Sequence, residues 1–288
     1  MSDYLKVLKR ARKRERVARF IAGAALWLIV LGIVSIIAII ASKGAASISW
    51  DFLFSMPQEQ MTAGGIWPAL YGTLMLILLT AAAALPLGIA TGIFLAEYAG
   101  RNRAVKWLRL AIANMAGIPS VIYGLFGYAA FSLALGFGKS LLAMGLTLAC
   151  VTLPIIITTT EEALKQVPAD LRTAALALGA TKWCTTYRVV LPAALPGIVT
   201  GTILSLSRAA GETAPILFTG VAFFAAVPQT IMQPSMALPY HLYIMATQPT
   251  KPAPHIVWGT ALVLVGLLCI INAIGALWRA RQRRKISW

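Results

Sequence analysis

The sequence predicts an all-α membrane protein with six transmembrane helices. Two observations carry this prediction: the composition is strongly apolar, and long apolar stretches alternate with connections of unequal charge. Of the 288 residues, 59% are hydrophobic and only 12% are charged, which is about half the charged fraction of a typical soluble domain. The composition therefore excludes a soluble globular fold.

A transmembrane helix needs about 20 consecutive, mostly apolar residues. Six stretches reach that length: 20–41, 67–96, 108–137, 141–160, 191–223 and 256–278. The first follows a basic run, as the core of a signal peptide does, but it is longer than the roughly 7–15 apolar residues of such a core. We expect a retained membrane helix at 20–41, an extracytoplasmic loop at 42–66 and the main transmembrane domain at 67–278.

The positive charges are divided unequally among the connections. Eight lysines and arginines precede the first stretch, four lie at the junction of the second and third, four between the fourth and fifth, and five after the sixth. Basic connections face the cytoplasm, so both termini are expected there, with basic tails at 1–19 and 279–288. Topology, not nucleic-acid binding, explains the net charge of +16. For the basic tail at 1–19 we favour an anchor to anionic lipid over a regulatory site.

The third stretch is not expected to be a straight helix, because Gly117 and Pro119 should break or kink it. Irregular backbone at membrane depth is tolerated only where protein or a water-filled cavity covers it. The break either packs against a neighbouring helix or lines a passage. In the second case Asn114, Ser120 and Tyr123 would supply polar groups.

Arg208 and Glu212 are the only formally charged residues between Arg188 and Lys251. Each costs about 2.5–3.5 kcal/mol near the centre of a membrane helix. Their i, i+4 spacing allows an ion pair, which could simply fix the helix register. The functional alternative is that the charges mark a substrate path, since a guanidinium matches phosphate or carboxylate oxygens.

Pro215 should loosen the helix beside Glu212, because it cannot donate a hydrogen bond to the carbonyl of Gly211. An unpaired arginine could hold an anion too tightly for release, and passage needs binding that is also weak enough to reverse. We therefore hypothesise that Glu212 competes for Arg208. The candidate substrate pathway comprises Arg208, Glu212, Thr213, Asn114, Ser120 and Tyr123.

The outer connection after the fifth stretch is rich in proline, which disfavours a long helix there. A short interfacial helix is possible at 236–245, with His241 at headgroup level.

The cytoplasmic connection at about 161–190 contains a short amphipathic pattern. Pro168 suits the first turn of a helix, Asp170 lies near its positive end, and Gly179 suits its end. The apolar face comprises Leu171, Ala175 and Leu178. Such a helix could lie on the membrane surface or insert into a groove of a partner protein, and the pattern leaves both open.

This connection resembles the cytoplasmic loop in the membrane subunits of bacterial ABC importers, which carries E-A-A, three residues, glycine, nine residues and I-x-L-P. Here the same spacing joins Ala174-Ala175, Gly179 and "VVLP" at 189–192, with Thr173 in place of the usual glutamate. The resemblance implies the type I ABC importer permease architecture and a coupling helix that docks on an ATPase. The coupling residues would be Asp170, Leu171, Thr173, Ala174, Ala175, Gly179, Ala180 and Pro192.

The segments "RAAGETAPILFTG", "GIPSVIYGLFG" and "TTEEALKQVPADLR" resemble the phosphate importer permeases of the Pst system, of the PstA type, and the likeness extends from about residue 67 onward. It implies half of a translocation pathway for phosphate in the bacterial inner membrane. The implied partners are a PstC-type permease subunit, a dimer of ATP-binding subunits and an extracytoplasmic phosphate-binding protein.

No nucleotide or metal motif is recognised in the sequence. "GFGKS" at 136–140 has Leu133 where a P-loop needs its first glycine. We therefore expect no cofactor in this chain, with ATP and Mg²⁺ on the partner ATPase. Three alternatives remain: the same architecture carrying another oxyanion or small solute, a membrane scaffold, and an intramembrane enzyme using Glu212. No second carboxylate or histidine in the membrane supports the enzyme.

Overall fold

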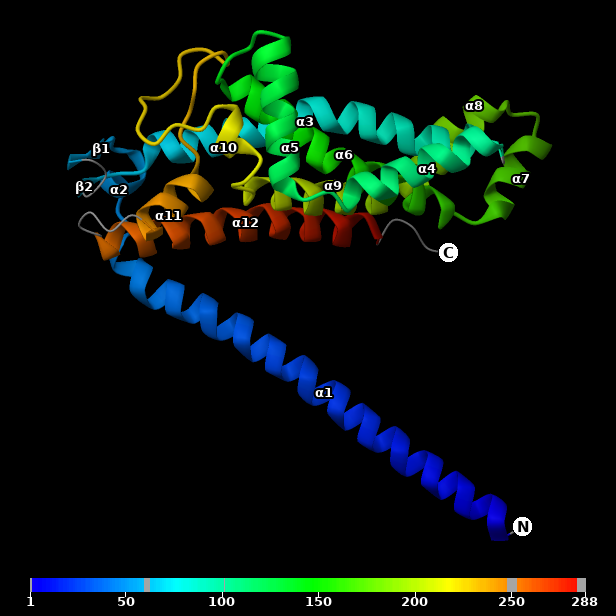
Figure 1. Cartoon of the computed structure of the whole chain (residues 1–288). Coiled ribbons are helices and arrows are strands. Elements are labelled where there is room, and N and C mark those ends of the chain that lie inside the picture. Colours follow the sequence, from blue (N-terminus) through cyan, green and yellow to red (C-terminus); the bar gives the residue numbers. More distant parts are fainter. Residues whose placement is uncertain (1, 60–62, 101, 248–252, 284–288) are drawn as a thin grey trace.

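The computed structural model describes residues 2–59, 63–100, 102–247 and 253–283, and they are almost entirely helical (Figure 1). The elements are α1 (Ser2–Gly44), η1 (Ala45–Ser47), α2 (Trp50–Phe54), β1 (Pro57–Gln58), β2 (Ala63–Gly64), α3 (Trp67–Ile93), η3 (Phe94–Tyr98), α4 (Arg103–Ala116), α5 (Ser120–Gly127), η4 (Tyr128–Ala134), α6 (Leu141–Lys165), α7 (Ala169–Ala177), α8 (Lys182–Thr185), η5 (Thr186–Val190), α9 (Leu191–Ala210), α10 (Ile216–Thr219), α11 (Leu238–Thr247) and α12 (Pro254–Arg283). The two short strands pair antiparallel in the first outer loop.

Five helical rods are long and apolar enough to cross a membrane, and α4 with α5 and η4 forms a sixth, broken span. The five rods are Arg14–Ser47, Trp67–Tyr98, Leu141–Lys165, Lys182–Ala210 and Pro254–Arg281. The sixth bends by 103° between Ala116 and Ser120, where Gly117 and Pro119 were expected to break it. The predicted all-α membrane fold is confirmed, with five straight spans among the described residues and a sixth if the bent pair is counted as one span.

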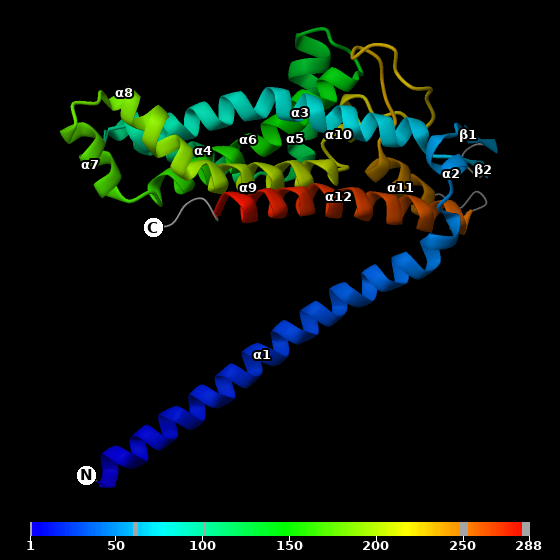
Figure 2. The same cartoon turned by 180° about the vertical axis from the view of Figure 1, so that it is seen from behind.

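Helix α6 lies at the centre of a bundle with α3, α9 and α12 (Figures 1 and 2). Small residues allow its neighbours to approach closely. A Cβ added at Gly92 of α3 would lie 2.6 Å from Cβ of Thr160, and one at Gly201 of α9 would lie 2.5 Å from Cβ of Thr159. Two helices thus contact α6 nearly backbone to backbone at its cytoplasmic half.

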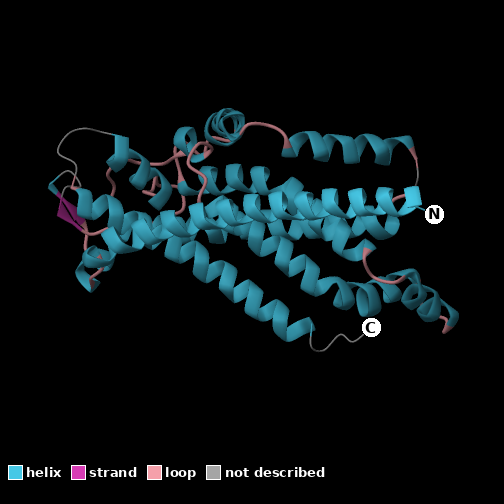
Figure 3. Ribbon diagram, turned by 90° about the horizontal axis from the view of Figure 1, so that it is seen from below, coloured by secondary structure: helices cyan, strands magenta, loops and turns pink. Residues whose placement is uncertain are grey.

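Helix α1 leaves the bundle at its outer end and diverges from it (Figures 1 and 3). It contacts the bundle where Gly44 meets the backbone of Trp258 and where Nζ of Lys43 lies 4.7 Å from the Trp258 ring centroid. The start of α1, although far from the bundle, and the end of α12 both lie toward the side on which the bundle carries α7. This agrees with the predicted location of both termini on one side of the membrane.

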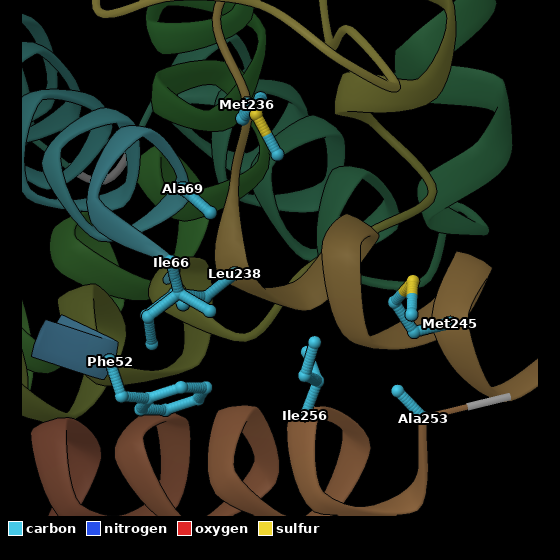
Figure 4. Packing of buried hydrophobic residues seen from close by; sticks show 8 residues of the cluster. All are labelled: Phe52, Ile66, Ala69, Met236, Leu238, Met245, Ala253 and Ile256. Atoms are coloured by element: carbon cyan, nitrogen blue, oxygen red, sulfur yellow. The ribbon is translucent and has the colours of Figure 1, made fainter. Parts of the chain in front are cut away.

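The outer end of the bundle is closed by a hydrophobic cluster that joins α2, α3, α11 and α12 (Figure 4). Its buried members are Phe52, Ile66, Ala69, Met236, Leu238, Met245, Ala253 and Ile256. Because these residues come from distant parts of the sequence, the first outer loop and the proline-rich connection form one cap.

The fifth span differs from the single stretch predicted at 191–223. Its helix begins at Lys182 and ends at Ala210, and a turn at 211–215 separates it from α10. Pro215 cannot continue the hydrogen-bond ladder, so the outer part of the span is irregular. The π-helical turn η5 ends two residues before Pro192, whose ring would collide with the carbonyl of Arg188 in a regular α-helix.

The predicted outer helix is present as α11, but His241 does not lie at the headgroup surface. The packing of α11 against α12 leaves this side chain only 2% exposed. Its Nδ1 lies 3.4 Å from Oγ1 of Thr260, and its Nε2 has no protein partner among the described residues. Burial lowers the pKa of His241 to about 4.

The buried imidazole should make stability depend on pH. The pKa of His241 is about 4 in the folded protein and about 6.5 in an unfolded chain, so the unfolded state binds more protons between these values. Stability therefore falls as the pH falls below 6.5, by about 2 kcal/mol at pH 5. We expect the apparent melting temperature in detergent to drop less on acidification in His241→Gln than in wild type. An equal drop in both proteins would contradict this expectation.

Candidate functional site

The candidate site begins at the end of α9, where Arg208 occupies the last helical turn. Glu212 follows in a tight turn, and its Oε1 accepts a hydrogen bond of 3.4 Å from Nε of Arg208. The side chain of Arg208 is 63% exposed and that of Glu212 is 18% exposed. Neither terminal guanidinium nitrogen has a hydrogen-bond partner within the described chain. The predicted ion pair exists, but it leaves most donors of Arg208 free.

The contact between α9 and α12 sets the depth of this pair. Ser207 donates a hydrogen bond of 3.1 Å from Oγ to Oδ1 of Asn272. At about 1.5 Å per residue, Asn272 lies about 21 Å along α12 from Trp258, which lies beside the outer end of the first span. The hydrocarbon layer is about 30 Å thick, so Ser207 and Arg208 lie inside it, about two thirds of the way across from its outer boundary.

An exposed guanidinium at that depth cannot be left against lipid without a large cost in free energy. The face of α9 that carries Arg208 must therefore be covered by another subunit or by water. This exposure does not fit the alternative in which the ion pair is buried inside the bundle of this chain to fix helix register.

The break in the third span forms the second part of the candidate site. Asn114 is exposed in the last turn of α4, and Ser120 is the half-buried first residue of α5. Tyr123 is buried, and its hydroxyl donates a hydrogen bond of 2.8 Å to the carbonyl of Met115 across the break. Tyr123 therefore braces the bent backbone from within.

The breaks in the third and fifth spans pack against each other. A Cβ added at Gly124 of α5 would lie 3.0 Å from the carbonyl oxygen of Ala214 and 3.1 Å from that of Pro215. This close approach places the segment with Glu212 and Thr213 beside α5.

The structure thus brings the two groups of candidate residues into one region but does not join them directly. Among the described residues, no hydrogen bond links Arg208 or Glu212 to Asn114, Ser120 or Tyr123. Thr213 is half-buried in the turn after α9.

Glu212 also faces the interior of the bundle. It lines a small cavity of about 10 Å³ together with Thr73 and Thr80 of α3 and Leu148 of α6. That volume is roughly the room for one water molecule. The α3–α6 pair therefore forms the wall behind the candidate site.

Two polar residues at this site were missed by the sequence analysis, Ser207 and Asn272. Asn272 is an exposed amide in the otherwise apolar α12, and its Nδ2 donates a hydrogen bond of 2.9 Å to the carbonyl of Leu268. Because polar side chains are rare within membrane spans, the amide of Asn272 could have been recognised from the sequence as a candidate functional residue. Its position beside α9 depends on helix packing.

The predicted coupling helix is present as α7, and none of its residues is fully buried. Asp170 lies in its first turn, and Thr173 Oγ1 donates a hydrogen bond of 3.2 Å to the carbonyl of Ala169 at the surface. Gly179 ends the segment with a φ of +82°, a conformation that glycine adopts without strain. The exposed helix can therefore present a surface to a partner.

The faces of α7 differ from the prediction at one position. Leu171 packs against the cluster of α6 and α9, and Ala175 is half-buried on the same side. Leu178 is 89% exposed, because the helix ends at Ala177 and the face is not continued. Of the other predicted coupling residues, Ala174 and Pro192 are exposed, whereas Ala180 is half-buried.

The family model described as "Binding-protein-dependent transport system inner membrane component" matches residues 88–288. The chain is 34% identical to the "Phosphate transport system permease protein PstA" of Mycobacterium leprae over 96% of this chain and 92% of that protein. It is 39% identical to "PstA 1" of Mycobacterium tuberculosis strain H37Rv over 78% of this chain and 73% of that protein.

Solved structures show the same fold at lower identity. The chain matches a chain of the inward-facing MetNI methionine ABC transporter with a TM-score of 0.61 and 20% identity, covering 75% of this chain and 97% of that one. A chain of a bacterial ABC transporter for the acidic polysaccharide alginate gives a TM-score of 0.63 and 13% identity, covering 96% and 99%.

The family match identifies a multi-pass inner-membrane permease subunit that is not itself catalytic and that works with an ATPase and a binding protein. This chain therefore belongs to the binding-protein-dependent permeases of ABC importers, in the family of the PstA phosphate transport permeases.

Proposed function

We propose that this chain forms half of the translocation pathway of an ATP-driven importer of inorganic phosphate, with Arg208 as the residue that meets the anion. The observation that carries the proposal is the guanidinium exposed at a depth inside the hydrocarbon layer, with terminal nitrogens that have no partner in the described chain. The names of the Mycobacterium relatives support phosphate as the cargo.

The electrostatics of the site suit transient binding. The guanidinium offers paired donors that match a phosphate. Two negative charges oppose a tight complex: the Glu212 carboxylate at 3.4 Å and the carboxyl end of the α9 dipole. An anion would compete with Glu212 for Arg208, which keeps its affinity low enough for release.

The partners follow from the same proposal. A PstC-type permease would cover the exposed face of Arg208, and a phosphate-binding protein would deliver the anion at the outer cap. An ATPase dimer would bind α7 and hold the ATP and Mg²⁺. ATP binding would draw the ATPases together and move α7, which opens the passage outward, and hydrolysis would reset it.

Replacing Arg208 by glutamine should strongly reduce phosphate uptake. A charged hydrogen bond contributes about 1.5–3 kcal/mol, so we expect at least about a tenfold loss of initial uptake at low phosphate. The measurement uses cells that lack the native chain and other phosphate importers, at matched membrane abundance. Arg19→Gln is the control, because it removes an exposed i, i+4 pair with Glu15 on α1.

The role of Arg208 and the identity of the cargo are tested by two separate outcomes. Restoration of uptake by Arg208→Gln would make Arg208 a structural charge. If wild type fails to restore phosphate uptake although its partners are present, phosphate is not the cargo.

Replacing Glu212 by glutamine should tighten anion binding and slow release. Without its competing carboxylate, Arg208 is free to hold the anion, so the phosphate concentration for half-maximal uptake and the maximal rate should both fall. Uptake kinetics in proteoliposomes containing the whole transporter would measure both quantities. A faster maximal rate with an unchanged half-saturating concentration would contradict the competition.

Replacing Leu178 by aspartate should weaken ATPase binding without harming the fold, because this side chain is 89% exposed. An apolar side chain buried at an interface contributes about 1.5–3 kcal/mol, so co-purification of the ATPase should fall about tenfold or more. Equal recovery of the ATPase with both proteins would place Leu178 outside the docking surface.

A further inference from the structure

Arg172 connects the coupling helix to two transmembrane helices at once. Its Nη1 donates a hydrogen bond of 2.7 Å to the carbonyl of Val167, and its Nη2 donates one of 2.8 Å to that of Leu164. Both carbonyls lie at the carboxyl end of α6, where backbone acceptors lack helical donors and the dipole favours a cation. Arg172 therefore holds α7 against the end of α6.

The same guanidinium binds a carboxylate on a third element. Nη2 and Nε of Arg172 lie 2.7 Å and 3.2 Å from Oε1 of Glu97, which belongs to the last turn of the rod formed by α3 and η3. The side chain of Glu97 is 9% exposed and that of Arg172 is 24% exposed. Four of the five guanidinium N–H groups are thus bound to protein acceptors.

Burial of the Glu97 carboxylate and partial burial of the Arg172 guanidinium distinguish this pair from ordinary surface ion pairs, which are weak and easily broken. Removing Arg172 would leave the nearly buried Glu97 carboxylate without compensation. The bidentate geometry also restricts the orientation of α7, since both nitrogens must face one carboxylate.

The elements held by Arg172 extend to the candidate substrate site. The close contact at Gly92 and Thr160 makes α3 and α6 a tightly packed pair. The end of α3 has a second attachment, because Nη2 of Arg109 in α4 donates a hydrogen bond of 2.8 Å to the carbonyl of Leu95. At the other end, α3 and α6 supply the wall behind Glu212.

We propose that Glu97 and Arg172 form a latch that makes the coupling helix and the α3–α6 pair move as one unit. The latch would carry ATP-driven motion of α7 to the wall of the substrate site. Glu97 and Arg172 are positioning residues in this account and touch neither phosphate nor ATP. The inference rests on the proposed function, in which an ATPase moves α7.

The test uses the complete transporter reconstituted in proteoliposomes with its binding protein. Glu97→Gln keeps the shape of the side chain and removes its charge. Arg172→Lys keeps the charge, but an ammonium cannot bind Glu97 and both carbonyls with the same geometry. Glu162→Gln is the control, because Glu162 is exposed on the same end of α6.

We expect both latch variants to retain the bound ATPase and basal ATP hydrolysis. The stimulation of hydrolysis by the binding protein and the phosphate carried per ATP should each fall at least about fivefold. Glu162→Gln should match wild type in both ratios. If Glu97→Gln does not assemble, Arg172→Lys decides the matter.

Suppose that the latch variants differ from wild type only in a lower yield or melting temperature, with an unchanged amount of phosphate carried per ATP. That result would show that the pair of Glu97 and Arg172 merely stabilises the fold, and it would overturn the proposal. Failure of the cargo assignment gives a different result. In that case wild type responds to the binding protein by hydrolysing ATP but carries no phosphate, and the latch is judged from the stimulation alone.

Discussion

The absence of hydrogen-bonding solvent in the bilayer is the constraint on which most of this structure depends. Within the hydrocarbon layer, charged side chains and irregular backbone are stable only where protein or water covers them. Two spans are nevertheless broken there, after Ala116 and after Ala210, and the broken parts pack together at Gly124. Arg208 is exposed beside them. The features most costly to leave against lipid therefore lie together, on a region that a partner or a water-filled passage has to cover.

The same constraint explains the organisation of the bundle around α6. Small residues bring α3 and α9 against it, so dispersion and close packing hold the helices where the hydrophobic effect between them is weak. A bundle packed in this way is stiff and can move as a unit. Charges with several partners occur at its cytoplasmic end, where Arg172 joins α7 to α3 and α6.

Glu212 shows how one side chain can serve two environments. Its carboxylate pairs with Arg208 on the exposed face and also borders the small cavity behind that face. The distance of 3.4 Å from Nε of Arg208 to Oε1 of Glu212 is longer than that of an ideal charged hydrogen bond, which is about 2.7–2.9 Å. A contact of that kind is readily exchanged for an anion, as a passage requires.

The sequence by itself determined the apolar spans, the break at Gly117 and Pro119 and a helix in the connection at 161–190, and its charge distribution predicted the topology, because apolar length, charge distribution and proline chemistry are local properties. It also identified Arg208 and Glu212 as unusual. Only the tertiary structure decided that Arg208 is exposed, that Ser207 meets Asn272, that His241 is buried and that Glu97 meets Arg172. These contacts join residues far apart in the chain, and their register is set by how closely the helices pack, which no local pattern encodes.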